Sequence, residues 1–91
     1  MITFSQALNC LKSGSRIARA GWNGKGMFLQ LIKENEWKLP DTSVVNGAIL
    51  PLLSFIGMKT ADNKFVPWLA SQTDILAEDW DIANEKDWLK K

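Results

Sequence analysis

The segment KTADNKFVPWLASQTDILAEDW, residues 59–80, contains the signals that decide most of the fold. Asp62 and Asn63 tolerate a left-handed backbone, so ADNK predicts the tight turn of a β-hairpin. The strand that returns from this turn, KFVPW, includes Pro67. Because proline has no N–H to donate to a sheet, we expect this strand to lie at an edge of the sheet or to end there.

The second half of the segment predicts a helix followed by a strand. Ser71, with Asp74 three residues later, can cap a short helix, and Thr73 could cap it instead. DWDIA, residues 79–83, predicts a last short strand. Trp80 follows an acidic pair at the start of this strand, and we expect it in the hydrophobic core.

The chain before this segment begins with a predicted helix in TFSQALNCLKSG, residues 3–14. Thr3 and Gln6 have the spacing of a capping box, and Gly14 is a plausible stop for the helix. The apolar residues follow the helical spacing i, i+3, i+4, i+7, which gives one buried face: Phe4, Ala7, Leu8 and Leu11.

Three further strands are predicted, in SRIARAGW, MFLQLIKE and ILPLLSFIGMKTA. The last, residues 49–61, is expected to be one long strand, bulged near Pro51 or Gly57. Residues 35–48 are rich in turn formers and predict an excursion from the sheet. The predicted fold is therefore one α+β domain over residues 1–91, a small antiparallel β-sheet with an N-terminal helix and a short C-terminal helix.

Composition excludes several kinds of partner. Eleven basic and ten acidic residues give a net charge of +1, which argues against binding to a nucleic-acid polymer. The longest apolar stretch, residues 48–58, is too short to span a membrane, and the N-terminus does not resemble a signal peptide. Cys10 is a lone cysteine, which fits a reducing cytoplasm. Its helical context favours a small buried hydrophobe over a nucleophile.

Catalytic chemistry is poorly represented in the sequence. The chain has no histidine, which removes the commonest general base and the commonest metal ligand. Glu78, Asp79 and Asp81 are close in sequence, but no companion ligands follow at metal-binding spacing. We therefore predict no catalytic residue, no metal and no cofactor. The five tryptophans suit either a core or a pocket in which a base stacks.

The first candidate binding feature is the loop GWNGKG, residues 21–26, with Trp22, Asn23 and Lys25. Its glycines let backbone N–H groups approach an anion, Lys25 adds a positive charge, and Trp22 offers a face for stacking. The spacing is neither that of a P-loop nor that of a dinucleotide fingerprint. An ordinary hairpin loop, with Trp22 packed on the core, explains the same residues.

The second candidate is Trp68, followed by the polar run Ser71, Gln72, Thr73 and Asp74. An aromatic face beside the start of a helix can hold a base and a ribose or phosphate. Here Asp74 is expected to accept hydrogen bonds from ribose hydroxyls, and Thr73 to bond a ribose or phosphate oxygen. The alternative is that the polar run only caps the helix.

Three motifs together resemble one family: TFSQAL, ARAGWNGKGM and MKTADNKFVPWLASQTDILAEDW. They are similar to the small phage and prophage proteins of the second type of Thoeris anti-defence family. Residues 35–50 lie outside the resemblance. On the family pattern, the expected ligand-binding residues are Trp22, Asn23, Lys25, Met27, Trp68, Ser71, Gln72, Thr73 and Asp74.

The resemblance implies a protein that acts without catalysis in the host bacterial cytoplasm. Members of this family resemble sponges that sequester glycocyclic ADP-ribose, the signal made by a bacterial TIR-domain enzyme. Some members also sequester the cyclic dinucleotides of CBASS defence systems. The family further implies a homotetramer, a dimer of dimers, with ligand pockets at subunit interfaces. Two alternatives stay open: an enzyme that degrades the signal, and an inhibitor that binds a defence protein through exposed tryptophans.

Overall fold

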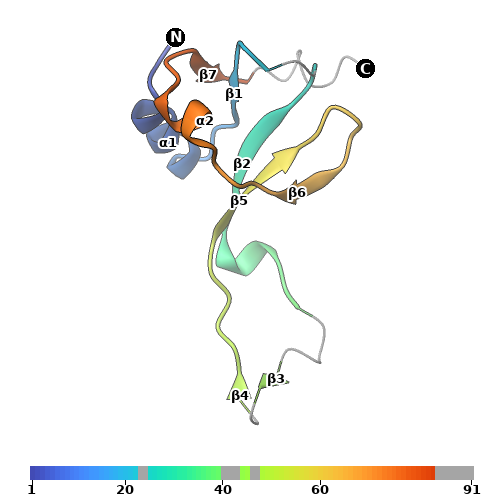
Figure 1. Ribbon diagram of the computed structural model, residues 1–91. Coiled ribbons are helices and arrows are strands. Elements are labelled where there is room, and N and C mark those ends of the chain that lie inside the picture. Colours follow the sequence, from blue (N-terminus) through green and yellow to red (C-terminus); the bar gives the residue numbers. More distant parts are fainter. Residues whose placement is uncertain (23–24, 40–43, 46–47, 84–91) are drawn as a thin grey trace.

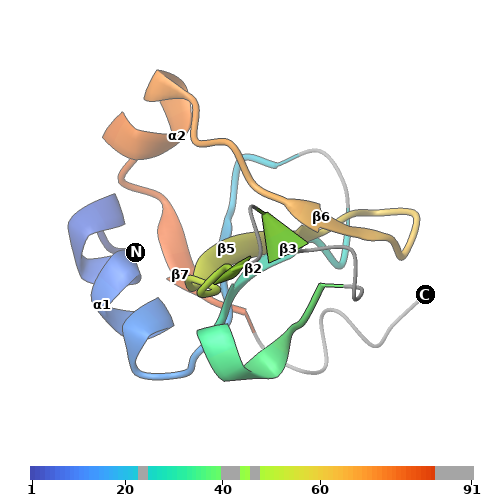
Figure 2. The ribbon, with the colours of Figure 1, turned by 90° about the horizontal axis from the view of Figure 1, so that it is seen from below.

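A computed structural model describes residues 1–22, 25–39, 44–45 and 48–83. Five antiparallel strands form one sheet in the order β6-β5-β2-β1-β7, and two helices lie together beside it (Figures 1 and 2). The elements in chain order are α1 Phe4–Lys12, β1 Ile17–Arg19, β2 Phe28–Ile32, the 3-10 helix η1 Glu34–Glu36, β3 Val44–Val45, β4 Ala48–Ile49, β5 Phe55–Lys59, β6 Phe65–Pro67, α2 Gln72–Leu76 and β7 Trp80–Ile82. The predicted α+β class is confirmed.

Helix α1 begins and ends where its sequence predicts. The Thr3 hydroxyl accepts from the Gln6 N–H at 3.3 Å, and the Gln6 side chain accepts from the Thr3 N–H at 2.9 Å. This reciprocal pair satisfies backbone donors that a helix start otherwise leaves without partners. After the helix, Gly14 has φ +100°, a conformation that favours glycine.

The β5–β6 hairpin also follows its prediction. Asn63 in the turn has φ +65°, and β6 forms one edge of the five-stranded sheet. Gly57 on β5 lies opposite Pro67 in a regular register, so the expected bulge is absent at Gly57. The ring of Phe65 lies against Gly57. A Cβ atom at position 57 would come within 2.2 Å of this ring, so a side chain there would clash with it.

The hydrophobic core lies between the sheet and α1. Trp80, the first residue of β7, has no exposed surface and is the largest fully buried side chain among the described residues, as the sequence predicts. Around it are the other fully buried apolar residues, Ala7, Leu11, Ile17 and Leu29. Trp22, Trp68 and Phe4 pack against this cluster and are only partly buried. This arrangement fixes the aromatic residues that the sequence offers for binding.

The predicted long strand over residues 49–61 is wrong. Strand β4 ends at Ile49 and β5 begins at Phe55, with no strand in residues 50–54. Pro51 cannot donate to a ladder, and the Leu53 carbonyl accepts from the Trp37 indole at 3.0 Å. β4 pairs instead with β3 in a separate two-stranded sheet, which lies away from the main sheet (Figure 1). The described residues of the excursion predicted over residues 35–48 thus lie in an arm that projects from the main sheet (Figure 1).

Candidate functional site

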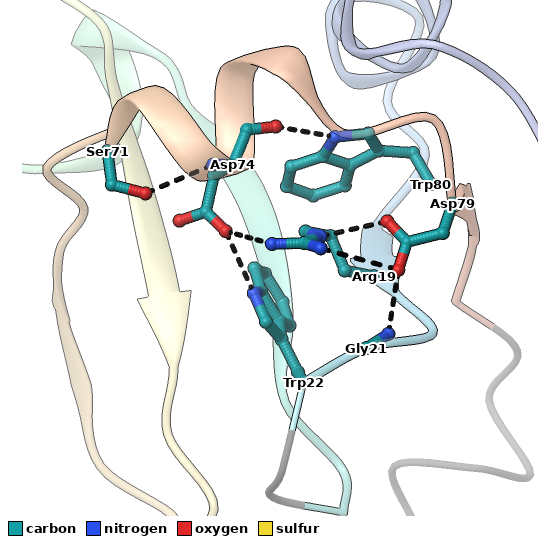
Figure 3. A network of polar contacts seen from close by, with 7 residues as sticks. All are labelled: Arg19, Gly21, Trp22, Ser71, Asp74, Asp79 and Trp80. Atoms are coloured by element: carbon teal, nitrogen blue, oxygen red, sulfur yellow. Dashed lines mark hydrogen bonds and ion pairs between the residues drawn. The ribbon is translucent and has the colours of Figure 1, made fainter.

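Arg19 is the centre of a polar network beside the buried Trp80 (Figure 3). The register of β1 and β7 places Arg19 opposite Trp80. Its Nε donates to Asp79 Oδ1 at 2.8 Å, and its Nη1 donates to Asp74 Oδ1 at 2.8 Å. The side chains of Arg19 and Asp74 are each 16% exposed, and that of Asp79 is 25% exposed. One guanidinium therefore joins the carboxylate of Asp74, which lies in α2, to that of Asp79, which lies between α2 and β7.

The same carboxylates hold the loop that follows β1. Asp79 Oδ2 accepts from the Gly21 N–H at 2.8 Å, and Asp74 Oδ1 accepts from the Trp22 indole at 3.3 Å. The backbone carbonyl of Asp74 accepts from the Trp80 indole at 2.9 Å. These bonds tie β1, the glycine loop, α2 and β7 to one another (Figure 3).

The charges in this network stabilise one another. Hydrogen bonds, first to Asp79 and then to Asp74, raise the pKa of Arg19 above its ordinary value. Hydrogen bonding by Arg19 lowers the pKa of Asp79. For Asp74, partial burial acts to raise the pKa, but the hydrogen bonds from Arg19 and Trp22 outweigh it and the pKa is lowered. Both carboxylates are therefore ionised at neutral pH.

The two tryptophans predicted to bind a base both pack on Trp80. The Trp22 ring lies 5.4 Å from that of Trp80, nearly perpendicular at 82°, and the Trp68 ring lies 6.2 Å away at 84°. Trp68 also contacts Phe4, with ring centroids 5.9 Å apart. The packing of Trp22 on the core is thus confirmed. A stacking role for the partly exposed surface of either ring stays a prediction.

Of the polar run, Asp74 bonds directly to Arg19 and Trp22, and Ser71 bonds to Asp74. The Ser71 hydroxyl accepts from the Asp74 N–H at 3.1 Å, which confirms Ser71 as the cap of α2. Gln72 and Thr73 are exposed in the first turn of that helix. Their contact with a ligand remains a prediction.

The structure does not bring the residues predicted from the glycine loop to a single place. Lys25 is exposed, and Asn23 lies outside the described residues. Met27 lines a cavity of about 190 Å³ together with residues of β1 and β7. The structure therefore brings Trp22, Trp68 and Asp74 around Trp80, and places Met27 in a different hollow.

Sequence reasoning missed Arg19 and gave Asp79 no structural role. A signal was available, because Arg19 shares the face of a short strand with Ile17, which is fully buried. A charged side chain on a buried face needs partners of opposite charge. Asp74 and Asp79 flank the helix end nearest to it, but only the antiparallel pairing of β1 with β7 brings them within reach.

Two kinds of site are not seen in the part of the chain that the structure describes. No three cysteine or acidic side chains there are grouped as a metal ion would require. None of the helices there has the length and apolar character needed to cross a membrane.

These features define a small α+β domain in which partly buried aromatic rings and two carboxylates are joined around Trp80 and Arg19. Comparison with known proteins gives its family. The family model described as Thoeris anti-defense 2-like domain matches residues 2–83. The protein named Thoeris anti-defense 2, from Bacillus phage SP01, is 44% identical over 86 residues, covering 91% of this chain and 96% of the phage protein. The chain belongs to the Thoeris anti-defense 2-like family, which supports a phage anti-defence role.

Proposed function

We propose that the protein is a sponge that binds glycocyclic ADP-ribose and sequesters it intact. The observation that carries the proposal is that Trp22 bonds Asp74 at 3.3 Å, while Trp22 and the partly exposed Trp68 both pack on Trp80. Aromatic faces bind bases by stacking, which contributes about 1–3 kcal/mol per base. A carboxylate beside them accepts hydrogen bonds from sugar hydroxyls.

One carboxylate oxygen of Asp74 does not contact Arg19. The Oδ1 of Asp74 accepts from both Arg19 and Trp22, while its second carboxylate oxygen is directed away from Arg19 (Figure 3). Hydrogen bonding by the Ser71 side chain also lowers the pKa of Asp74, so a ribose hydroxyl would share this carboxylate with Ser71. We assign the second oxygen to the ribose hydroxyls, with Thr73 and Gln72 as exposed neighbours that can donate to the ligand. Trp22 and Trp68 would then take the base, and Lys25 a phosphate.

The proposed assembly is a homotetramer, a dimer of dimers, in the host bacterial cytoplasm. The support in this chain is its exposed apolar surface, since Leu53 and Leu76 are each 76% exposed and Leu69 is 91% exposed. A chain of 91 residues has a small core, so association is an effective way to cover such surface. The same exposed leucines also support a second candidate function, a protein-binding inhibitor of a defence component.

One depletion experiment separates these functions. The protein is incubated with glycocyclic ADP-ribose, free ligand is measured, and the protein is then boiled and the supernatant measured again. A sponge depletes the ligand and releases it unchanged on boiling. Release of an altered molecule would assign an enzyme, and no depletion would leave the inhibitor. Repeating the assay with cyclic dinucleotides tests whether CBASS signals are also bound.

Asp74→Asn tests the assignment of the ribose contact. Asparagine keeps an oxygen for Arg19 and Trp22 but replaces the second oxygen by an NH₂ group, which cannot accept. We expect weaker binding by about 1.5–3 kcal/mol, the contribution of a hydrogen bond to a charged group, with the fold retained. Calorimetric titration measures this loss. Unchanged affinity would return Asp74 to a purely structural role.

A further inference from the structure

We infer that Arg19 is a positioning residue, which keeps Trp22 and Asp74 in the geometry that binds the ligand without touching the ligand itself. This inference rests on the sponge function proposed above. The side-chain hydrogen bonds of Arg19 all go to the two carboxylates: Nε and Nη2 donate to Asp79, at 2.8 and 3.5 Å, and Nη1 donates to Asp74 at 2.8 Å. Figure 3 shows the guanidinium between the two carboxylates, with the Trp22 ring on one side and Trp80 on the other.

The geometry requires the planar fork of arginine. Asp74 and Asp79 are reached by different nitrogens of one guanidinium, and a lysine ammonium is a point charge that cannot reproduce this arrangement. Without the fork, the positive charge would be placed less well between Asp74 and Asp79. The repulsion between these two carboxylates, each at least three-quarters buried, would then be offset less fully. Asp74 would turn or move, and the acceptor of the Trp22 indole would move with it.

The network also couples two segments that are far apart in the sequence. Through Asp79, Arg19 fixes the Gly21 N–H at the start of the glycine loop. Through Asp74, it fixes α2, whose carbonyl at that residue holds the Trp80 indole. Ligand residues from the loop and from α2 are therefore placed relative to one another by a single side chain. Such preorganisation favours affinity because less ordering remains to be done on binding.

The matched control is Arg16, three residues earlier on the approach to β1. Its guanidinium lies 5.0 Å from the centre of the Phe28 ring, and its Nε donates to Gln30 at 3.0 Å. Both of these partners belong to β2, whereas the side-chain partners of Arg19 are Asp74 and Asp79. Arg16→Lys and Arg19→Lys make the same chemical change to the same residue type, so they separate a positioning effect from the general loss of an arginine.

Two measurements test the inference on folded protein. In nitrogen-15 NMR spectra, Arg19→Lys is expected to shift the Trp22 indole resonance and to speed hydrogen exchange at the Trp22 indole and the Gly21 amide. Calorimetric titration with glycocyclic ADP-ribose is expected to show at least tenfold weaker binding. Arg16→Lys should leave the Trp22 indole resonance unshifted. The exchange rates and the dissociation constant of this variant should stay within twofold of the wild type. An unshifted Trp22 indole, or equal losses in the two variants, would overturn the inference.

A second variant covers a failure of Arg19→Lys to fold. Asp79→Asn removes the charge on the carboxylate that contacts Arg19 and Gly21 but takes no part in the proposed ligand contacts. It should speed exchange at the Trp22 indole, which is three hydrogen bonds away through Arg19 and Asp74, and weaken binding at least threefold. If exchange at that indole is unchanged, Arg19 does not transmit position. If the wild type binds no ligand, the sponge proposal fails, whereas the exchange data still decide whether Arg19 couples loop and helix.

Discussion

The body of the molecule around Trp80 and the projecting arm are built in opposite ways. We define the body as the five-stranded sheet with α1 and α2, and the arm as residues 34–39, 44–45 and 48–54. In the body, the apolar residues enclose a fully buried tryptophan and Arg19 bonds two carboxylates. In the arm, Leu39, Leu50 and Leu53 are exposed. The polar bonds near its base include Trp37 to the Leu53 carbonyl and Ser54 to Glu34.

The difference teaches that the two regions have different sources of stability. The body closes its own core, whereas residues of the arm, together with Phe55 and Pro67, line an apolar hollow of about 630 Å³, and none of these described lining residues is charged. A lone two-stranded sheet such as β3–β4 is at best marginally stable in water. In the proposed homotetramer, a second copy would cover this surface. The following predictions test the contrast, from the largest expected effect to the smallest.

The largest effect is expected from Trp80→Ala in the body. Trp80 is fully buried, its ring contacts Trp22 and Trp68, and its indole donates to Asp74. The substitution should lower the free energy of unfolding by about 3–5 kcal/mol, as removal of a buried aromatic side chain does. Urea denaturation at fixed protein concentration measures it. Trp37→Ala in the arm is the control and should cost far less. Equal costs would contradict the division into body and arm.

The second effect concerns association. Leu53→Ser removes an exposed leucine of the arm, which should leave the body folded but weaken the oligomer. Burying a leucine contributes about 1.5–3 kcal/mol, so the dissociation constant should rise roughly tenfold to a hundredfold. Sedimentation over a concentration series measures this. Leu69→Ser is the comparison, because Leu69 is an even more exposed leucine that lies outside the arm. Loss of assembly in Leu69→Ser alone would move the interface from the arm to the segment between β6 and α2.

The same contrast explains which features could be predicted from the sequence. The capping box of α1, the turn at Asn63 and the cap of α2 by Ser71 depend on neighbours within a few residues, so local patterns suffice. The long strand predicted over residues 49–61 was wrong, because Leu50 and Leu53 belong to the exposed surface of the arm and only Phe55–Lys59 forms a strand of the main sheet. The Arg19 network depends on the pairing of β1 with β7, which joins residues far apart in the chain.

The third prediction is that acid lowers the free energy of unfolding through carboxylates of the body and not through those of the arm. The pKa values of Asp74 and Asp79 lie below the ordinary value of 3.8 in the folded protein. Between the folded and unfolded pKa values, the unfolded chain binds more protons, so this stability is complete above about pH 4 and is lost as the pH falls further. Unfolding free energy measured from pH 6 downward should therefore decline below about pH 4.

Matched variants assign that decline. Asp79→Asn should flatten the acid limb, because one of the two carboxylates no longer titrates. The pKa of Glu34 in the arm is also lowered, chiefly by a hydrogen bond from Ser54, but this carboxylate is exposed. Exposed pairs contribute little to stability, so Glu34→Gln should leave the acid limb unchanged. A flatter limb in Glu34→Gln than in Asp79→Asn would show that the arm, and not the body, is sensitive to acid.

The smallest effect is expected from helix caps, and it separates the two regions most finely. Ser71 caps α2 in the body by accepting from the Asp74 N–H. In the arm, Glu36 accepts from the Lys33 N–H at 2.8 Å at the start of η1. Both residues are exposed and each satisfies one backbone donor. Their environments differ, because α2 is bonded to Trp80 and Arg19 through Asp74, whereas the arm lies outside that network.

Loss of the Ser71 cap should therefore lower the stability of the whole body. Ser71→Ala is expected to cost about 1 kcal/mol in the free energy of unfolding, and Ser71→Asn, which can cap as well as serine, should restore most of it. Glu36→Ala should change global stability by less than half as much, because the turn of η1 can open while the body stays folded. Thermal and urea unfolding of the three variants measure this. If Glu36→Ala costs as much as Ser71→Ala, the arm unfolds with the body and not before it.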